Sequence, residues 1–447
     1  MDPARRVAFD VLRAVSERDA YANLVLPAML RARHITGRDA AFATELAYGA
    51  CRVRGLLDAI IAAAADRPVD SISPVLLDLL RLGSYQLLRT RVEQHAAVST
   101  TVEQAGIEFD SARAGFVNGV LRTIGGRNEA EWIAELAPDP IRDPVGHAAF
   151  VYAHPRWIAQ AFGDALGARA GELGALLASD DERPQVHLAA RPGVLTAAEL
   201  AAEVAGTVGR YSPYAVYLPG GDPGELAPVR HHRALVQDEG SQLVARALTR
   251  APVAGDTGRW LDLCAGPGGK TALLAGIGAA AGARVTAVEP VAKRAERVAE
   301  NTRGLPVDVL TVDGRDVGRL EGPEPGFDRV LVDVPCTGLG SLRRRPEARW
   351  RRQPADIPEL TRLQRELLAA AIGLTRPGGV VLYATCSPHL AETVGVVGGA
   401  LRWHPVEVLD ARELFEPVDQ LGPGPYVQLW PHRHGTDAMF AAALRVH

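Results

Sequence analysis

"LDLCAGPGGKT", Leu261–Thr271, places a glycine-rich turn between a short apolar run and a helix-forming stretch, "KTALLAGIGAAA". Four further runs rich in Val and Leu follow it, separated by helix-forming stretches: "RVTAVE", "VDVLTVD", "DRVLVDVP" and "GGVVLYATC". Apolar strands that alternate with helices predict a doubly wound α/β fold with a parallel sheet. Because ligands of such sheets bind beyond the carboxyl ends of the strands, the residues that end these runs are candidates for a site.

The glycine-rich turn admits three interpretations. A Walker phosphate loop requires glycine at the position that Cys264 occupies, so that motif fails. A GxGxxG dinucleotide loop fits Gly266 and Gly268, but Lys270 and Thr271 occupy its last two places. The third interpretation is a loop for a nucleoside-bearing cofactor such as S-adenosylmethionine. Ordinary turn chemistry without a ligand is the alternative to all three.

Two acidic residues favour the nucleoside cofactor. Glu289 ends the second apolar run, about twenty residues after the loop, where an acid commonly binds a ribose diol. Asp313 ends the third run, within expected reach of an adenine amino group. The glycines at 266, 268 and 269 allow the backbone to approach a cofactor closely. The loop and both acids at successive strand ends therefore predict one cofactor site.

Two of the four cysteines of the chain also stand at strand ends. Cys336 follows "LVDVP" and Cys386 follows "LYAT", so both thiols are expected to face the methyl donor. A thiolate there suits nucleophilic addition to carbon 6 of cytosine, which activates carbon 5 for methylation. Asp333 is the nearest candidate for an acid at ring nitrogen 3, and Lys270 for a cation that favours the thiolate.

Other interpretations of the cysteines stay open at this point. A cysteine at a strand end is often only a small apolar residue. Two thiols can also share a metal, but neither CxxC nor Cys-x-x-His spacing is present, so no metal is predicted. Cys264 is expected to contribute backbone to the loop and not to act as a nucleophile.

An arginine-rich segment, "SLRRRPEARWRRQ", follows the Cys336 run directly. Arginine forks suit phosphates, and a tryptophan can stack on a base. A solvated charged loop is the alternative. The sequence predicts RNA contacts for Arg343, Arg344, Arg345, Arg349, Trp350 and Arg351. Since a base must leave its stack to reach a pocket at strand tips, the expected substrate is an unstacked cytosine.

The rest of the chain divides by pattern. Residues 1–130 predict an all-α bundle, in which Ser73 and Pro74 open a helix and Cys51 packs in the core. Residues 131–240 predict a linker and a small α+β lead-in, and residues 241–447 the α/β domain.

The composition sets further bounds. The 447 residues carry a formal charge of −4, so RNA binding must come from local patches. Apolar runs are too short for a membrane span, and no membrane contact is expected. Four cysteines without paired spacing predict reduced thiols and a cytoplasmic location.

At these motifs the chain resembles the Sun/Fmu (RsmB-type) ribosomal RNA 5-methylcytosine methyltransferases. "LCAGPGGKT", "DVPCTGLGSLRRRPEARW" and "YATCSPHLAE" are similar to that family's signatures, as are "VQDEGSQL" and "PHRHGTDAMFAA". "FVNGVLR" and its neighbours resemble NusB-type RNA-binding domains. The resemblance implies a multidomain protein with a NusB-like bundle, a Rossmann-like class I methyltransferase domain, and a monomer that acts on 16S rRNA.

The resemblance also implies residue roles. Cys386 becomes the nucleophile and Cys336 the residue that aids product release. The implied S-adenosylmethionine site comprises Cys264, Ala265, Gly266, Pro267, Gly268, Gly269, Lys270, Glu289, Asp313 and Asp333. The main alternative is a non-catalytic RNA-binding assembly factor that retains the fold. An amino-group methyltransferase is a second alternative, but such sites need no thiol.

Overall fold

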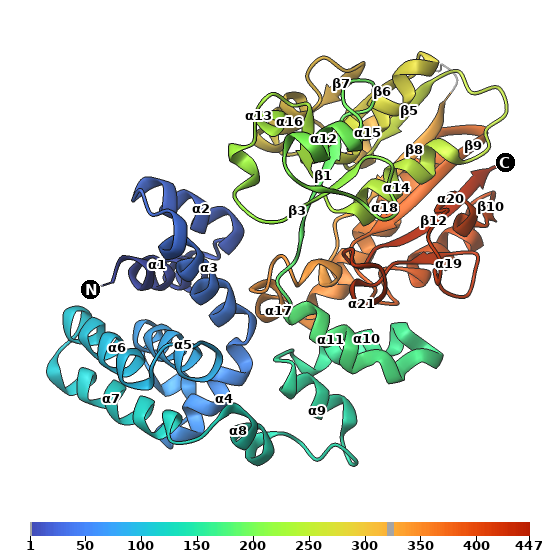
Figure 1. The fold of residues 1–447 in the computed structure, drawn as a ribbon. Coiled ribbons are helices and arrows are strands. Elements are labelled where there is room, and N and C mark those ends of the chain that lie inside the picture. The colour runs from blue at the N-terminus through green and yellow to red at the C-terminus, as the bar shows by residue number, and fades with distance from the viewer. Residues whose placement is uncertain (1, 320–325) are drawn as a thin grey trace. The chain divides into compact units, whose positions relative to one another are not determined.

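The structure, a computed structural model, describes residues 2–319 and 326–447 (Figure 1). It contains two compact units. The first comprises Met1–Arg183 and Leu342–Arg352, and the second comprises Pro184–Ser341 and Gln353–His447. The predicted combination of an all-α bundle with an α/β domain is confirmed.

The first unit is helical throughout its described residues. Asp2 caps its first helix by accepting a hydrogen bond from the Arg5 amide at 2.9 Å, and Pro74 occupies the first turn of α5. Cys51 is buried in the core, as predicted, and burial raises the pKa of its thiol to about 12. The helices are α1 (Pro3–Arg18), α2 (Ala22–Ala32), α3 (Gly37–Arg52), α4 (Arg54–Ala65), α5 (Pro74–Arg89), α6 (Gln94–Glu108), α7 (Ser111–Gly125), α8 (Glu129–Leu136), α9 (Pro144–Val151), α10 (Arg156–Leu166), α11 (Leu173–Asp181) and α17 (Ala348–Arg351), with 3-10 turns at Val69–Ser71 and Gly167–Glu172.

The lead-in predicted over residues 131–240 is divided between the two units. Its first part, through Arg183, forms helices of the first unit, because apolar side chains such as Trp132 and Ala153 join that unit's core. Its second part forms an antiparallel sheet in the second unit, with strand order β2-β3-β1-β4. The elements are β1 (Val186–Ala190), α12 (Ala197–Glu203), β2 (Thr207–Val208), β3 (Ala215–Leu218), α13 (Ala227–Arg230) and β4 (Ala234–Val236), with a 3-10 turn at Pro223–Glu225.

A larger sheet forms the centre of the second unit. Its order among the described residues is β10-β12-β9-β8-β5-β6-β7, and β11 pairs with β12. The five strands that the sequence predicted are parallel to one another, whereas β10, β11 and β12 are antiparallel additions that it did not predict. The strands are β5 (Arg259–Asp262), β6 (Arg284–Val288), β7 (Val307–Leu310), β8 (Phe327–Asp333), β9 (Thr375–Thr385), β10 (Val406–Leu409), β11 (Val427–Gln428) and β12 (Phe440–Val446).

Helices cover both faces of this sheet (Figure 1). Alternate residues of β9 divide between two cores: Leu382 packs with α14 and α15, whereas Tyr383 packs with α18 and α19. Burial on both faces explains why the central strands read as continuous apolar runs. The helices are α14 (Glu239–Arg250), α15 (Gly269–Gly278), α16 (Ala292–Asn301), α18 (Ile357–Leu374), α19 (Val394–Trp403), α20 (Ala411–Leu414) and α21 (Pro431–His434), with 3-10 turns at Ala279–Ala281, Gly314–Arg319, Leu339–Ser341 and Pro354–Asp356.

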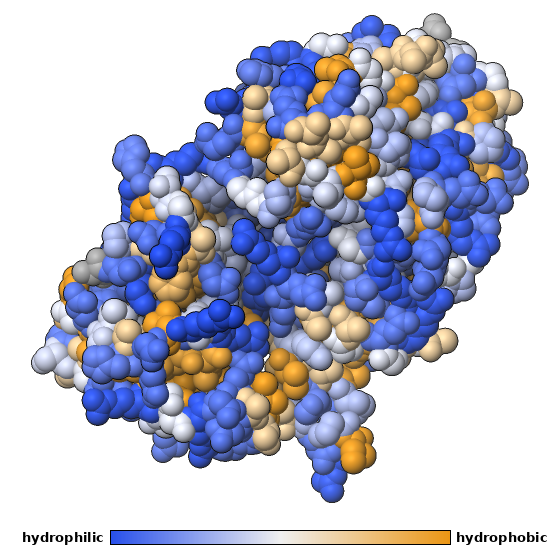
Figure 2. All heavy atoms as spheres, viewed as in Figure 1, coloured by the Kyte–Doolittle hydropathy of each residue, from blue (hydrophilic) through white to orange (hydrophobic). Residues whose placement is uncertain are grey.

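The topology locates the site. The sequence order reverses between β5 and β8, which are adjacent and parallel in the sheet. Such a switch point opens a crevice at the carboxyl ends of the strands. Hydrophilic side chains cover most of the visible face in Figure 2, with apolar residues in scattered patches. Among the described residues no helix is both long and apolar enough to cross a membrane.

Candidate active site

Cys336 and Cys386 meet at this edge of the sheet. They follow the ends of the neighbouring parallel strands β8 and β9, and their Sγ atoms are 3.3 Å apart. Both residues are half-buried. Fifty residues of sequence separate them, and the register of β8 on β9 brings them together. Both thiols therefore lie at the edge of the sheet where the predicted strand ends placed them, and the structure adds that they touch.

Lys270 brings a positive charge to the same place from the first turn of α15. Its ammonium donates to Asp333 Oδ2 and to Ser241 Oγ, each at 2.8 Å. Burial opposes the charge of Lys270, but Asp333 and then Cys386 act against burial and raise its pKa. The site thus contains a fixed cation whose charge interacts with Cys386.

Three other ionisable groups near the strand tips, Asp262, Cys264 and Cys336, have raised pKa values. Burial raises the pKa of Asp262 to about 6, although Asp262 accepts a hydrogen bond from Thr271 at 2.7 Å. Burial also raises the pKa of Cys264 well above its usual value, which agrees with a loop residue that is no nucleophile. Contact with Cys386, burial and nearby negative charge raise the pKa of Cys336.

The glycine loop lies against Glu289. A Cβ at Gly266 would lie 2.0 Å from Glu289 Oε2, so only glycine allows this approach. Gly268 has a φ of +104°, and a Cβ there would lie 3.0 Å from the Val298 backbone. Glu289 is buried, and Arg294 lies 3.1 Å from its carboxylate. The geometry suits a cofactor that presents hydroxyl groups to a buried carboxylate.

Asp313 lies beyond the third strand, which ends at Leu310 and not at Asp313 as predicted, and Arg315 engages both of its oxygens. The Nε and Nη2 atoms of Arg315 donate at 2.9 and 2.8 Å, which holds the pKa of Asp313 below its usual range. Arg315 also donates to Glu366 at 2.7 Å. A carboxylate oxygen accepts more than one hydrogen bond, so Asp313 keeps acceptor capacity for a donor such as an adenine amino group. The loop and the two acids therefore fit an adenosyl cofactor.

The prediction of RNA contacts for the arginine-rich segment is wrong for Arg349. That side chain is 0% exposed within the first unit. Its guanidinium donates to the carboxylate of Asp181 at 2.9 Å and to backbone carbonyls of Arg52, Ala153 and Asp180 at 3.1–3.2 Å. A guanidinium that is fully enclosed by protein acceptors offers no donor to a phosphate.

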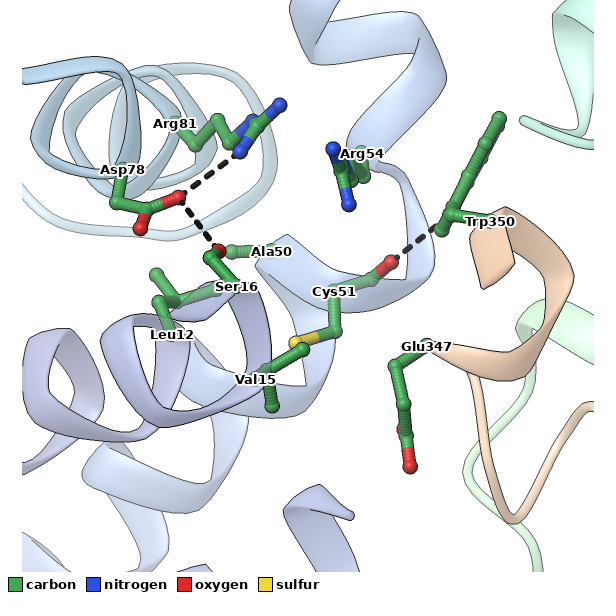
Figure 3. Close-up of a pocket in the computed structure, with 10 residues that line it drawn as sticks. All are labelled: Leu12, Val15, Ser16, Ala50, Cys51, Arg54, Asp78, Arg81, Glu347 and Trp350. Carbon is green, nitrogen blue, oxygen red and sulfur yellow. Dashed lines mark hydrogen bonds and ion pairs between the residues drawn. The ribbon is translucent and has the colours of Figure 1, made fainter. Parts of the chain in front are cut away.

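Trp350 is half-buried and is anchored within the first unit, and RNA contact by its ring stays a prediction. Its Nε1 donates to the Cys51 carbonyl at 3.1 Å (Figure 3). Its ring packs against the helical core beside Gly55. The neighbouring Glu347 is buried, and burial raises the pKa of its carboxyl group. These residues line a pocket of about 10 Å³ in the first unit, which is the scale of one water molecule and not of a ligand.

The remaining arginines of the segment divide by exposure. Arg343 is buried, and Arg351 donates to the carbonyls of Val15 and Ala20, so neither is a free phosphate ligand. Arg344 is half-buried and Arg345 is exposed. For these two, RNA contact stays a prediction.

Several residues of the site were not anticipated. Ser241 holds Lys270, and Asn301 donates to the Pro267 carbonyl at 2.9 Å from α16. Arg294 donates to the Gly266 carbonyl at 3.1 Å. Glu392, in the quoted stretch "YATCSPHLAE", is fully buried beside both cysteine loops. The sequence offered one signal for Glu392, namely that an acidic residue lies close to Cys386, the candidate nucleophile.

Comparison with known proteins adds independent findings. A family model described as "16S rRNA methyltransferase RsmB/F" matches residues 247–445, and one described as "NusB family" matches residues 2–125. A putative methyltransferase of Mycobacterium tuberculosis is 78% identical over 446 residues, covering 100% of this chain and 97% of the relative. Ribosomal RNA small subunit methyltransferase B of Erwinia tasmaniensis is 32% identical over 460 residues, covering 99% of each chain.

Solved structures share the fold. The crystal structure of PH0851 superposes with a TM-score of 0.81 at 22% identity, covering 99% of this chain and 98% of the other. NSun6 from Pyrococcus horikoshii, solved with SFG, gives a TM-score of 0.56 at 19% identity and covers 66% of this chain and 99% of the other. At these identities the likeness concerns the fold alone.

Proposed function

Because the chain belongs to the ribosomal RNA small subunit methyltransferase B family, we propose that it methylates carbon 5 of a cytosine through a covalent cysteine adduct. The coarser activity follows from the family: S-adenosylmethionine-dependent methylation of rRNA. The finer proposal covers the base, the atom, the covalent step and 16S rRNA as the substrate. We further propose that the chain acts as a monomer in the cytoplasm.

The pair of thiols carries this proposal. Carbon 5 of cytosine is a weak nucleophile toward a methyl sulfonium. When the Cys386 thiolate adds to carbon 6, the displaced electron pair gives carbon 5 enamine character. S-adenosylmethionine supplies the electrophilic methyl group. Loss of the carbon 5 proton then restores the double bond and expels the Cys386 thiolate. Methylation of an amino group needs no thiol, and here two thiols lie 3.3 Å apart at the strand tips.

The charges around the thiols support a division of roles. The Lys270 ammonium interacts with Cys386, and a cation near a thiol suits a nucleophile. The raised pKa of Cys336 makes that thiol the poorer candidate for the nucleophile. With Cys386 as the nucleophile, Cys336 is proposed to assist the elimination. Asp333, which accepts from Lys270, is proposed to act at ring nitrogen 3 together with that lysine.

Tritium transfer from labelled S-adenosylmethionine to RNA tests the activity. We expect label in 5-methylcytosine of small-subunit rRNA when the protein acts on RNA from a strain that lacks the enzyme. Label on an exocyclic amino group would contradict the cytosine-5 proposal. A protein that binds RNA but transfers no label would support the non-catalytic assembly factor instead.

The cofactor loop gives a further prediction. Glu289→Ala is expected to weaken S-adenosylmethionine binding by about 1–3 kcal/mol, because the ribose hydroxyls lose a charge-assisted acceptor. Isothermal calorimetry measures the change. Glu296→Ala, an exposed glutamate on α16, is the matched control and should bind as the wild type does. Equal affinity in both variants would remove Glu289 from the site.

A further inference from the structure

Glu392 is the centre of a buried hydrogen-bond cluster behind the two thiols. It is 0% exposed. Its Oε1 accepts from the Thr337 amide and from Gln364 Nε2, each at 2.9 Å. Its Oε2 accepts from Ser387 Oγ at 2.6 Å and from the Thr337 hydroxyl. Four donors therefore converge on one carboxylate.

These donors connect Glu392 to both cysteine loops. Thr337 directly follows Cys336, and Ser387 directly follows Cys386. The two hydroxyl groups also touch, since Thr337 Oγ1 and Ser387 Oγ are 3.1 Å apart. One carboxylate thus ties together the backbones that present the two sulfur atoms.

Neighbouring contacts hold the cluster in place. Gln364 of α18 donates to the Pro335 carbonyl at 2.9 Å, on the other side of Cys336. The Tyr383 hydroxyl donates to the Glu392 carbonyl at 2.6 Å, and the Gly340 amide donates to the Cys386 carbonyl at 2.8 Å. A carboxylate with this support keeps a fixed position, which a positioning residue requires.

The charges on the two sides of the thiol pair differ. The four hydrogen-bond donors to Glu392 within the described residues are all neutral, so no direct ion pair compensates its negative charge. Glu392 contributes to the raised pKa of Cys336, after contact with Cys386 and burial. Lys270 and Asp333 lie on the other side of the two thiols. Tyr383 in β9 also interacts with Cys336, and Asp262 at the end of β5 interacts with Lys270.

We propose that Glu392 is a positioning residue that holds both cysteine loops in register and, through its charge, directs the thiolate to Cys386. The inference rests on the proposed function, because it explains why two neighbouring thiols can have different roles. Glu392 touches neither the base nor the cofactor in this proposal and acts through Thr337 and Ser387.

Two substitutions separate the charge of Glu392 from its tether, by which we mean its hydrogen bonds to Thr337 and Ser387. In Glu392→Gln the new amide oxygen can still accept hydrogen bonds from the Thr337 amide and from Gln364. The new amide nitrogen donates to the hydroxyl groups of Thr337 and Ser387, which then act as acceptors and no longer as donors. This variant keeps the hydrogen bonds and removes the charge. Glu392→Ala removes both. Glu407→Gln, an exposed glutamate on β10 that pairs with Arg445, is the matched control.

The first readout is the pH profile of iodoacetamide alkylation at each cysteine of the full-length protein, resolved by peptide mass spectrometry. We expect Glu392→Gln to shift the Cys336 profile to lower pH by about one unit, since a nearby like charge is removed. The Glu407→Gln profile should match the wild type. A purely structural role for Glu392 would not move this profile in the isosteric variant, and superimposable profiles would overturn the charge role.

The second readout is bridging of Cys336 and Cys386 by dibromobimane, in which each thiolate displaces one bromide. We expect efficient bridging in wild type and in Glu392→Gln, and at least a fivefold lower yield in Glu392→Ala at equal folded fraction. An unchanged yield in Glu392→Ala would overturn the tether.

A third readout concerns turnover. In Glu392→Ala, kcat for methylation should fall about tenfold or more, with KM for S-adenosylmethionine unchanged within twofold, because positioning affects the reaction and not cofactor binding. A rise in KM alone would contradict a positioning role. The alkylation and bridging measurements need no RNA, so their failure is distinguishable from a failure of the cytosine-5 proposal.

Discussion

We expect replacement of Cys386 with alanine to abolish methylation and to leave no covalent RNA adduct. Without its thiolate, nothing adds to carbon 6, and carbon 5 remains too weak a nucleophile to take the methyl group. We expect the loss to reach at least about 10⁴-fold, the scale for removing an essential nucleophile. Lys270 interacts electrostatically with Cys386, and its raised pKa keeps the ammonium charged at neutral pH.

Replacing Cys336 with alanine has a different outcome. This variant retains the nucleophile, so addition and methyl transfer proceed, but the adduct resolves slowly. An RNA-linked protein band should therefore survive denaturing electrophoresis. The band should require S-adenosylmethionine, the target cytosine and Cys386, and the double variant should show none.

The controls follow from the other cysteines. Cys51 is buried in the helical core and has no role in the proposed reaction. The Cys51→Ala variant should therefore retain methylation and form no stable RNA adduct. If Cys386→Ala traps the adduct and Cys336→Ala does not, the two roles are reversed. If methylation survives both substitutions, the covalent mechanism is wrong.

The second large effect concerns Arg349. Arg349→Ala should destabilise the first unit by about 3–5 kcal/mol, because it leaves the Asp181 carboxylate and three buried carbonyls without their donor. The side chain of Asp181 is only 14% exposed, so solvent restores little of the lost interaction. Urea unfolding, followed by limited proteolysis that resolves each unit, measures the change. Two units need not unfold in one transition, so the first unit is followed separately.

Neighbouring substitutions make this test specific. Arg345→Ala, four residues earlier and exposed above the Tyr21 ring at 5.5 Å, should cost about 1 kcal/mol or less. Arg349→Lys keeps the charge but cannot reproduce the planar fork, so it should recover only part of the stability. An Arg349→Ala protein as stable as Arg345→Ala would contradict the anchor role.

Much of the fold was predictable from local pattern. The apolar runs ending at Asp262, Asp333 and Thr385 are strands in the structure, because continuous burial on two faces leaves a strong signal in the sequence. The antiparallel strands β10 and β12 were missed, since their pairing depends on residues far along the chain. The division of the lead-in at Arg183 was missed for the same reason.

Parts of the site were predictable too. The loop and the two cysteines follow strand ends, and Lys270 lies in the helix turn that follows the loop. A parallel sheet brings the carboxyl ends of its strands to one edge. Position along each run was therefore enough to predict that Cys336 and Cys386 share this edge, whereas their 3.3 Å contact follows from the sheet register. The sequence by itself determined which chemical groups reach that edge.

Tertiary structure alone decided the partners of each charged group. A run of six arginines looks the same in sequence whether its side chains face solvent or protein. Arg349 is buried because carbonyls at residues 52, 153 and 180 converge on it from three separate segments. Glu392 likewise acquires its place from Thr337 and Gln364, which are distant in sequence. Hydrogen-bond partners of this kind are set by three-dimensional proximity, and local sequence does not encode that proximity.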